Sequence, residues 1–352
     1  MSLLYKDRLF PQNDPALSLA RDLYLSVKNL PIISPHGHCD PSWFSENQRF
    51  PDPAKLFVVP DHYVFRMLVS HGVKLTELGI KTIDDSISES DPRKIWTKFS
   101  ENYYLFRGTP TAMWLDYSFE KVFEITEPLT LATSDLYYNH IEEKLSQPEY
   151  LPKALFDKFN IEVLSTTDSA ISDLSHHIDL KRSSWEGRVI PTYRPDSVID
   201  PELSDFESNL VTLGELTNED TSVWEGYLRA HRSRRLFFKE MGATATDHGH
   251  PSARTENLSN EQAERLFKRI IAKDFSWEDA DKFRGQMLTE MAKMSCEDGL
   301  VMQIHPGSRR NHSNKIFNQF GVDKGFDIPG TTDYVCALKP LLDEVGLRTD
   351  LT

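Results

Sequence analysis

Short apolar runs that end in polar or charged residues recur along this chain and predict buried strands. The first run covers 30–34, and the later runs cover 161–168, 189–196, 242–250 and 300–305. Amphipathic helical spacing fills the intervals between the later runs, most clearly at 263–272 and 276–297. Strands that alternate with helices of this length are typical of parallel βα units, either in a (β/α)8 barrel or in an open α/β sheet.

The segment 41–150 has a different pattern and predicts a helical insertion after the first strand. Prolines punctuate short helical pieces that are rich in aromatic residues. One piece begins after Asp61, whose carboxylate can cap a helix that Gly72 ends. Three segments are therefore expected: 1–40 with the N-terminal helix and first barrel strand, 41–150 with the insertion, and 151–352 with the remaining βα units.

The number of strands bears on the fold class. Five can be counted and a sixth can lie hidden before residue 151, whereas a closed barrel needs eight. The last predicted helix ends near Gly346, where a further strand is expected to begin. The expected fold class is therefore α/β, a (β/α)8 TIM-type barrel with a helical insertion, truncated before its last two strands.

The charge balance argues against several classes of partner. The 352 residues include 40 Lys and Arg against 54 Asp and Glu, a net charge of -14, which disfavours nucleic acid or an anionic membrane as the main partner. No run approaches the roughly 18 apolar residues of a spanning helix, and the first residues lack the pattern of a signal peptide. The three cysteines are widely separated, which fits a reducing compartment and predicts a cytoplasmic protein.

Two histidines one residue apart follow the first apolar run and are candidate metal ligands. Side chains two apart at a strand end point the same way, so His36 and His38 can converge on one ion. Gly37 between them lets the backbone turn tightly. The alternative is a pair of loop histidines bonded to backbone or water, and the apolar run before them favours the site.

Candidate functional residues also stand at the ends of other predicted strands. Arg194 ends the second of the later runs and offers fixed positive charge. Asp247 beside His248 can orient an imidazole or bind hydroxyls, and it can equally cap a following helix. His305 can be a ligand, a hydroxyl-binding group or an ordinary strand-end histidine. For His62, in the first turn of a helix within the insertion, a packed helix with a polar edge is the simpler explanation.

In its order of signatures, the chain resembles the uronate isomerase family, peripheral members of the amidohydrolase superfamily. Seven motifs carry the resemblance along most of the chain: 31–38 (Pro-Ile-Ile-Ser-Pro-His-Gly-His), 61–67, 106–110, 166–168, 191–196, 246–249, and 302–305 with 310–311. The resemblance implies a (β/α)8 barrel with a helical insertion. It also implies aldose-ketose isomerisation of hexuronates, D-glucuronate to D-fructuronate and D-galacturonate to D-tagaturonate, without nucleotide or flavin.

The resemblance assigns roles to individual residues. His36 and His38 match two ligands of one divalent metal ion, with zinc as the expected metal. The remaining matches lie around the uronate: His62, Tyr63 and Asp247 are the expected catalytic residues, and Arg194, His305 and Arg310 the expected substrate-binding residues. Proton transfer through an enediol needs an acid and a base, for which His62 and Tyr63 are the candidates. A small hexuronate is the expected partner, with a homo-oligomer as a further option.

Two departures from the family pattern leave other functions open. The Asp-Ser-Arg motif of the last barrel strand, which supplies a metal carboxylate and a substrate arginine, is absent. Ser169 and Ala170 replace the usual Asp and Pro after Asp168, so no catalytic role is expected for Asp168. One alternative is a metal-dependent hydrolase of the amidohydrolase superfamily, with only Asp247 available as a base beside a metal-bound water. The other is an inactive fragment that lacks the final metal-ligand strand.

Overall fold

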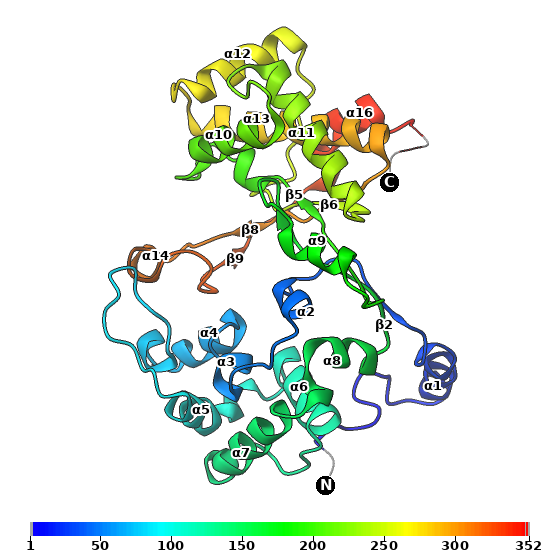
Figure 1. Ribbon diagram of the computed structural model, residues 1–352, viewed down its shortest axis with the longest axis vertical. Helices are drawn as coiled ribbons and strands as arrows, with labels where there is room; N and C mark the ends of the chain where they lie inside the picture. Colours follow the sequence, from blue (N-terminus) through cyan, green and yellow to red (C-terminus); the bar gives the residue numbers. More distant parts are fainter. Residues whose placement is uncertain (1–2, 349, 351–352) are drawn as a thin grey trace. The chain divides into compact units, whose positions relative to one another are not determined.

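The computed structural model describes residues 3–348 and 350, which divide into two compact units (Figure 1). Within the described residues, the first unit consists of 3–31, 47–160 and 310–328. The second consists of 32–46, 161–309 and the residues from 329 onward. Each unit therefore assembles segments that are far apart in the sequence. Along the described chain, no helix combines the length and the apolar character that crossing a membrane requires.

The first unit is helical. Four of its helices begin with proline at the first position, where the missing N–H costs nothing because no intrahelical partner exists there. Side chains of the preceding residues, for example Asp52, Asp91 and Thr109, accept hydrogen bonds from the first-turn amides. The helices are α1 (Ala16–Val27), α3 (Pro53–Phe57), α4 (His62–Ser70), α5 (Pro92–Glu101), α6 (Pro110–Tyr117), α7 (Ser134–Leu145), α8 (Pro152–Lys158) and α14 (Asn314–Phe320).

Aromatic packing forms the core of this unit. Trp96 on α5 is 1% exposed, and its Nε1 donates a hydrogen bond to the Ser134 carbonyl at 3.1 Å. Its ring lies 5.3 Å from that of Phe99 and 6.3 Å from that of Phe119, centroid to centroid. Because buried rings of this size remove a large apolar area from water, the short helices depend on this cluster for stability.

The second unit is built on parallel strands. β1 (Ile32–Ser34), β2 (Ile161–Ser165) and β4 (Arg188–Ile190) form one ladder, and β3 (Asp168–Ser169), β5 (Tyr193–Arg194), β6 (Ala245–His248) and β7 (Val301–Ile304) form another. Backbone hydrogen bonds from Thr166 N to Ile190 O and from Asp168 N to Thr192 O continue the pairing from one ladder into the next. Five consecutive runs of chain therefore lie side by side in sequence order, all parallel.

All five strands predicted from the apolar runs are present, and the α/β class with parallel strands is confirmed. Closure into an eight-stranded barrel is not seen in the described part of the chain, where β1 and β7 each pair with strands on one side only. Short strands β8 (Ser308–Arg309) and β9 (Ile328–Pro329) follow β7 along the chain.

Two long helices of the second unit begin at capping boxes, and one of them ends at a glycine. Ser259 with Gln262 and Ser276 with Asp279 form capping boxes, and Gly299 ends a helix in the left-handed region at φ 75°. α10 (Phe206–Thr217), α11 (Trp224–Glu240), α12 (Asn260–Ile271) and α13 (Trp277–Asp298) pack in sequence order, each on the next (Figure 1). The remaining helices are α2 (Ser42–Glu46), α9 (Ser175–Arg182), α15 (Tyr334–Ala337) and α16 (Lys339–Val345).

Substitution Trp96→Ala tests the role of the aromatic core. We expect a loss of about 3–5 kcal/mol in the free energy of unfolding, because the change removes a buried ring and leaves a cavity. Urea unfolding followed by far-UV circular dichroism measures the effect. Trp114→Ala is the matched control: Trp114 is 59% exposed, so its replacement should change stability by less than about 0.5 kcal/mol. Equal losses in the two variants would contradict this description of the core.

Candidate active site

The predicted site residues of the second unit follow the carboxyl ends of neighbouring parallel strands. His36 and His38 follow β1, Arg194 ends β5, Asp247 lies in β6 and His305 follows β7. Because the strands are parallel, these ends meet at one edge of the sheet. Gly37 allows the chain to approach β2 closely, since a Cβ there would lie 2.7 Å from the Ser165 carbonyl oxygen.

Asp247 is the centre of this arrangement. Its side chain is fully buried, and cationic or imidazole groups from three other strands surround it. His305 Nε2 donates a short hydrogen bond to Oδ1, and His36 Nε2 lies 2.9 Å from the same oxygen. Arg194 Nη1 lies 3.2 Å from Oδ2. A buried carboxylate is tolerated only with such compensation.

The surroundings keep Asp247 ionised. Burial alone raises the pKa of a carboxyl group, because it disfavours the charged form. The hydrogen bond from His305 and the charges of Arg194, His305 and His36 outweigh that effect and lower the pKa of Asp247 to about 2. Asp247 is therefore a carboxylate throughout the neutral pH range, as a hydrogen-bond acceptor or metal ligand must be.

Three side chains around Asp247 fit a metal ion. One ligand atom from each of His36, Asp247 and His305 lies within 4.8 Å of the others. Both His36 Nε2 and Asp247 Oδ2 are buried, and within the described residues neither makes a hydrogen bond of good geometry, although His36 Nε2 lies 2.9 Å from Asp247 Oδ1 and Arg194 Nη1 lies 3.2 Å from Asp247 Oδ2. Imidazole nitrogen and carboxylate oxygen are ordinary ligands of divalent metals such as zinc. The two imidazoles and the carboxylate of His36, His305 and Asp247 therefore fit one metal ion.

Residues after β5 and after β6 fix the position of the Arg194 side chain. Its Nε donates to Asp196 Oδ2 at 2.8 Å, and the Gly249 amide also donates to Asp196, at 3.1 Å from Oδ2. Gly249 has no Cβ to fill the space beside the guanidinium: a Cβ there would lie 2.9 Å from Asp196 Oδ2 and closer still to Arg194 Nη2. The Nε of the guanidinium is therefore fixed by Asp196, and its Nη1 faces Asp247.

The remaining predicted residues have different surroundings. The His38 ring lies 5.2 Å from that of His36, centroid to centroid, outside the group of three ligands. Burial and the neighbouring His36 lower the pKa of His38. His62 and Tyr63 belong to the helical unit and form the first turn of α4, with their ring centroids 4.4 Å apart. Asp61 caps that helix through the amide of Tyr63, as predicted.

The helical unit also contains Arg310, whose Nη1 lies 4.0 Å from Asp323 Oδ1 at the surface. The eight predicted residues are thus shared between the units. Five of them accompany the parallel strands, namely His36, His38, Arg194, Asp247 and His305, and three accompany the helical unit, namely His62, Tyr63 and Arg310.

A second group of polar residues was not singled out from the sequence. Asp196, His248 and His250 bring one ligand atom each within 4.8 Å of one another. Burial lowers the pKa of both histidines. The signal that identifies this group in the sequence is a second His-Gly-His at a strand end, 248–250, which repeats the pattern of 36–38.

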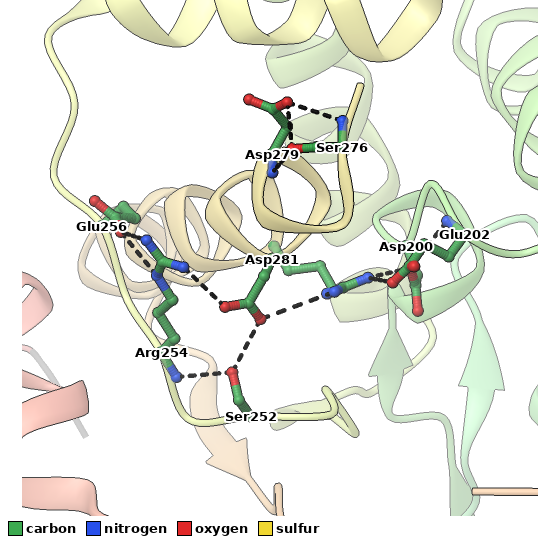
Figure 2. A network of polar contacts seen from close by, with 9 residues as sticks. Asp200, Glu202, Ser252, Arg254, Glu256, Ser276, Asp279 and Asp281 are labelled. Carbon is green, nitrogen blue, oxygen red and sulfur yellow. Dashed lines mark hydrogen bonds and ion pairs between the residues drawn. The ribbon is translucent and has the colours of Figure 1, made fainter. Parts of the chain in front are cut away.

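Salt bridges from α13 anchor the loops that carry these residues (Figure 2). Arg284, which is 6% exposed, donates from Nη1 to Asp200 Oδ1 at 2.6 Å and to Glu202 Oε2 at 2.8 Å, in the loop after β5. Arg254, in the loop after β6, donates to Asp281 Oδ2 on α13 at 3.0 Å. One helix therefore holds both loops, which limits how far Asp196 and the second His-Gly-His can move.

Comparisons with known proteins decide the family. The family model described as glucuronate isomerase matches residues 6–352. A uronate isomerase of Rhizobium meliloti is 55% identical over 99% of this chain and 75% of its own length, and one of Mesorhizobium japonicum is 55% identical over 100% and 75%. The chain belongs to the uronate isomerase family. It is therefore an isomerase of uronates, as the motifs implied, and this membership favours the isomerase over the hydrolase alternative.

Solved structures agree with this assignment. Glucuronate isomerase from Caulobacter crescentus is 49% identical and superposes with a TM-score of 0.96 over 99% of this chain and 73% of its own. Uronate isomerase from Thermotoga maritima is 26% identical, with a TM-score of 0.88 over 98% and 73%. The chain spans about three quarters of the length of these relatives.

Substitution Gly249→Ala tests the packing around Arg194. The added methyl group would collide with the guanidinium and with Asp196, so we expect at least about a tenfold loss in kcat/KM for uronate isomerisation. Steady-state kinetics measure the loss, and circular dichroism checks the fold. Gly330→Ala is the matched control, because its nearest atoms lie at 3.7 Å and 4.0 Å from the added carbon. Unchanged kinetics in Gly249→Ala would show that the guanidinium position does not matter.

Proposed function

We propose that the chain interconverts D-glucuronate with D-fructuronate, and D-galacturonate with D-tagaturonate, at the strand ends around Asp247. The observation that carries this proposal is the buried Asp247 carboxylate, which meets two imidazoles and a guanidinium. The reaction moves a proton between C2 and C1 through an enediol, so it requires fixed positive charge beside groups that exchange protons. The net charge of -14 makes a local cation necessary for an anionic sugar acid.

We propose His36, His38, Asp247 and His305 as the residues that would hold one divalent metal ion, zinc by its ligand preferences. The buried His36 Nε2 and Asp247 Oδ2, neither of which makes a well-formed hydrogen bond within the described residues, support this choice. When bound, the ion supplies a Lewis acid that anchors the substrate carboxylate. The resemblance led us to expect the metal carboxylate from an Asp-Ser-Arg motif, and Asp247 could supply that carboxylate instead. Its Oδ1 faces His36 and His305, and its Oδ2 faces Arg194.

We propose Arg194 as the group that pairs with the uronate carboxylate. Its Nε is occupied by Asp196 and its Nη1 faces Asp247, so Nη2 and the second N–H of Nη1 are the donors that a substrate carboxylate could use. His305 and Arg310 remain proposed substrate-binding residues. His62 and Tyr63 remain the proposed proton-transfer residues, an assignment supported by the 63% exposure of Tyr63 in the first turn of α4.

We further propose that the five parallel strands belong to a (β/α)8 barrel. Neighbouring strands lie about 4.8 Å apart, so the two edges of a flat five-stranded sheet are about 19 Å apart. The rings of His36 after β1 and His305 after β7 have centroids only 5.4 Å apart. Curvature of the sheet, as in the arc of a barrel, supports the proposal. The segments 1–40, 41–150 and 151–352 remain the proposed domain division, with a cytoplasmic location supported by three free cysteines.

An assay with both uronates tests the function. We expect ketose to form from D-glucuronate or D-galacturonate, with activity falling at least about tenfold after treatment with a strong chelator and returning on addition of Zn²⁺. Ketose is measured by its colour reaction or by chromatography. Hydrolysis of an amide or lactone without ketose formation would contradict the proposal. Full activity in metal-free protein would contradict the metal site alone.

Substitution Arg194→Lys tests the proposed carboxylate contact. Lysine keeps the charge but loses the planar fork and cannot bond Asp196 and the substrate together, so we expect kcat/KM to fall at least about tenfold. Arg229→Lys is the matched control, because Arg229 forms an exposed pair with Glu219 and should keep normal kinetics. Normal kinetics in Arg194→Lys would make Arg194 a structural residue of the strand end.

A further inference from the structure

Asp196, His248 and His250 form a second convergence of ligand atoms beside the first. Asp196 follows β5, His248 ends β6 and His250 lies two residues later. One ligand atom from each residue lies within 4.8 Å of the other two, and His250 Nε2 is 3.8 Å from Asp196 Oδ1. None of the three belongs to the group of His36, Asp247 and His305.

Both imidazoles have buried nitrogen atoms that need partners. His248 is fully buried and His250 is 5% exposed. Within the described residues, His248 Nδ1 and both ring nitrogens of His250 have no hydrogen-bond partner, whereas His248 Nε2 shares a hydrogen bond with Thr246 Oγ1 at 2.9 Å. An unsatisfied buried polar atom destabilises the folded state, so three in one place indicate a ligand that the protein itself does not supply.

The carboxylate of Asp196 has one oxygen, Oδ1, that can coordinate a metal ion. Its Oδ2 accepts hydrogen bonds from Arg194 Nε at 2.8 Å and from the Gly249 amide at 3.1 Å. Its Oδ1 receives only the longer contact from the same amide, at 3.3 Å, and lies on the side of His250. A carboxylate oxygen has two lone pairs, so Oδ1 can still coordinate a cation.

The surrounding charges favour a cation. Arg194 and Arg284 are the cationic groups that act on His250, and Asp196 and Asp200 are the anionic groups. The two guanidiniums are paired with five carboxylates: Asp196, Asp247, Asp200, Glu202 and Asp281, the last of which also pairs with Arg254. Carboxylates therefore outnumber guanidiniums around His250, which favours a bound cation over a bound anion.

We propose that Asp196, His248 and His250 bind a second divalent transition-metal ion, separate from the ion proposed at Asp247. Two imidazoles and one carboxylate suit Zn²⁺, Co²⁺ or Ni²⁺ rather than Mg²⁺ or Ca²⁺, which prefer oxygen ligands. This ion joins the end of β5 to the end of β6, and through Asp196 it also fixes Arg194. The proposal depends on the donor atoms alone and not on the reaction proposed above.

Metal content tests the proposal. The full chain is incubated with Zn²⁺, freed of loose metal by gel filtration, and measured by mass spectrometry of the element. We expect two equivalents for the wild type, one for His250→Gln, one for His36→Gln, and none for the double variant. His71→Gln, a surface histidine that contacts Tyr104, is the matched control and should keep two. Loss of all metal in His36→Gln, or an unchanged content in His250→Gln, would overturn the second site.

A crystallographic measurement covers the case in which His250→Gln fails to fold. Wild-type crystals grown with Zn²⁺ are measured at the zinc absorption edge. An anomalous peak between Asp196, His248 and His250 supports the proposal. An ordered water without anomalous signal at that position overturns it, whatever the occupancy found beside Asp247.

Discussion

The buried charge of Asp247 is the constraint on which the site depends. A carboxylate out of contact with water is stable only if hydrogen bonds and opposite charges replace its hydration. His36, Arg194 and His305 provide this replacement, and they come from three different strand ends. Removal of any one would leave part of a buried charge uncompensated. The positions of these three side chains are thus linked to each other through a single residue.

The parallel strand order makes this convergence possible. Each strand delivers its last residue to the same edge, and the strands lie in sequence order from β1 to β7. His36 and His305 come from strands at opposite ends of that order, yet their ring centroids are 5.4 Å apart. Curvature of the sheet is therefore needed to bring these two imidazoles together. Asp247, on the strand next to β7, lies where both imidazoles can reach it.

Two His-Gly-His motifs lie near the carboxyl ends of β1 and β6: the first begins two residues after β1, and the second begins at the last residue of β6. In both, the glycine permits a close approach: Gly37 to the Ser165 carbonyl and Gly249 to Arg194 and Asp196. The first motif directs His36 toward Asp247. The second places His248 and His250 around Asp196, which in turn orients Arg194. A metal ion at either position would thus influence the same guanidinium, from opposite sides.

Much of the architecture could be predicted from the sequence, because it depends on local rules. The five apolar runs predicted the five strands, Asp61 predicted the start of α4, and the helical spacing at 263–272 and 276–297 predicted α12 and α13. These features follow from side-chain periodicity and capping, which involve residues a few positions apart. His36 as a candidate metal ligand and Asp247 as a candidate catalytic residue were also recognisable, since each follows or ends a predicted strand.

Only the tertiary structure decided which of these residues meet. Asp247 lies 211 positions after His36 and 58 before His305 in the chain, and no local pattern reports that their side chains share one oxygen. The pairing of Arg194 with Asp196 and Asp247, and the unpaired nitrogens of His248 and His250, likewise arise from packing between strands. The sequence by itself determined the strands, the caps and the chemical types available. The curvature and order of the sheet determined the contacts, because distance in space between distant residues depends on the whole fold.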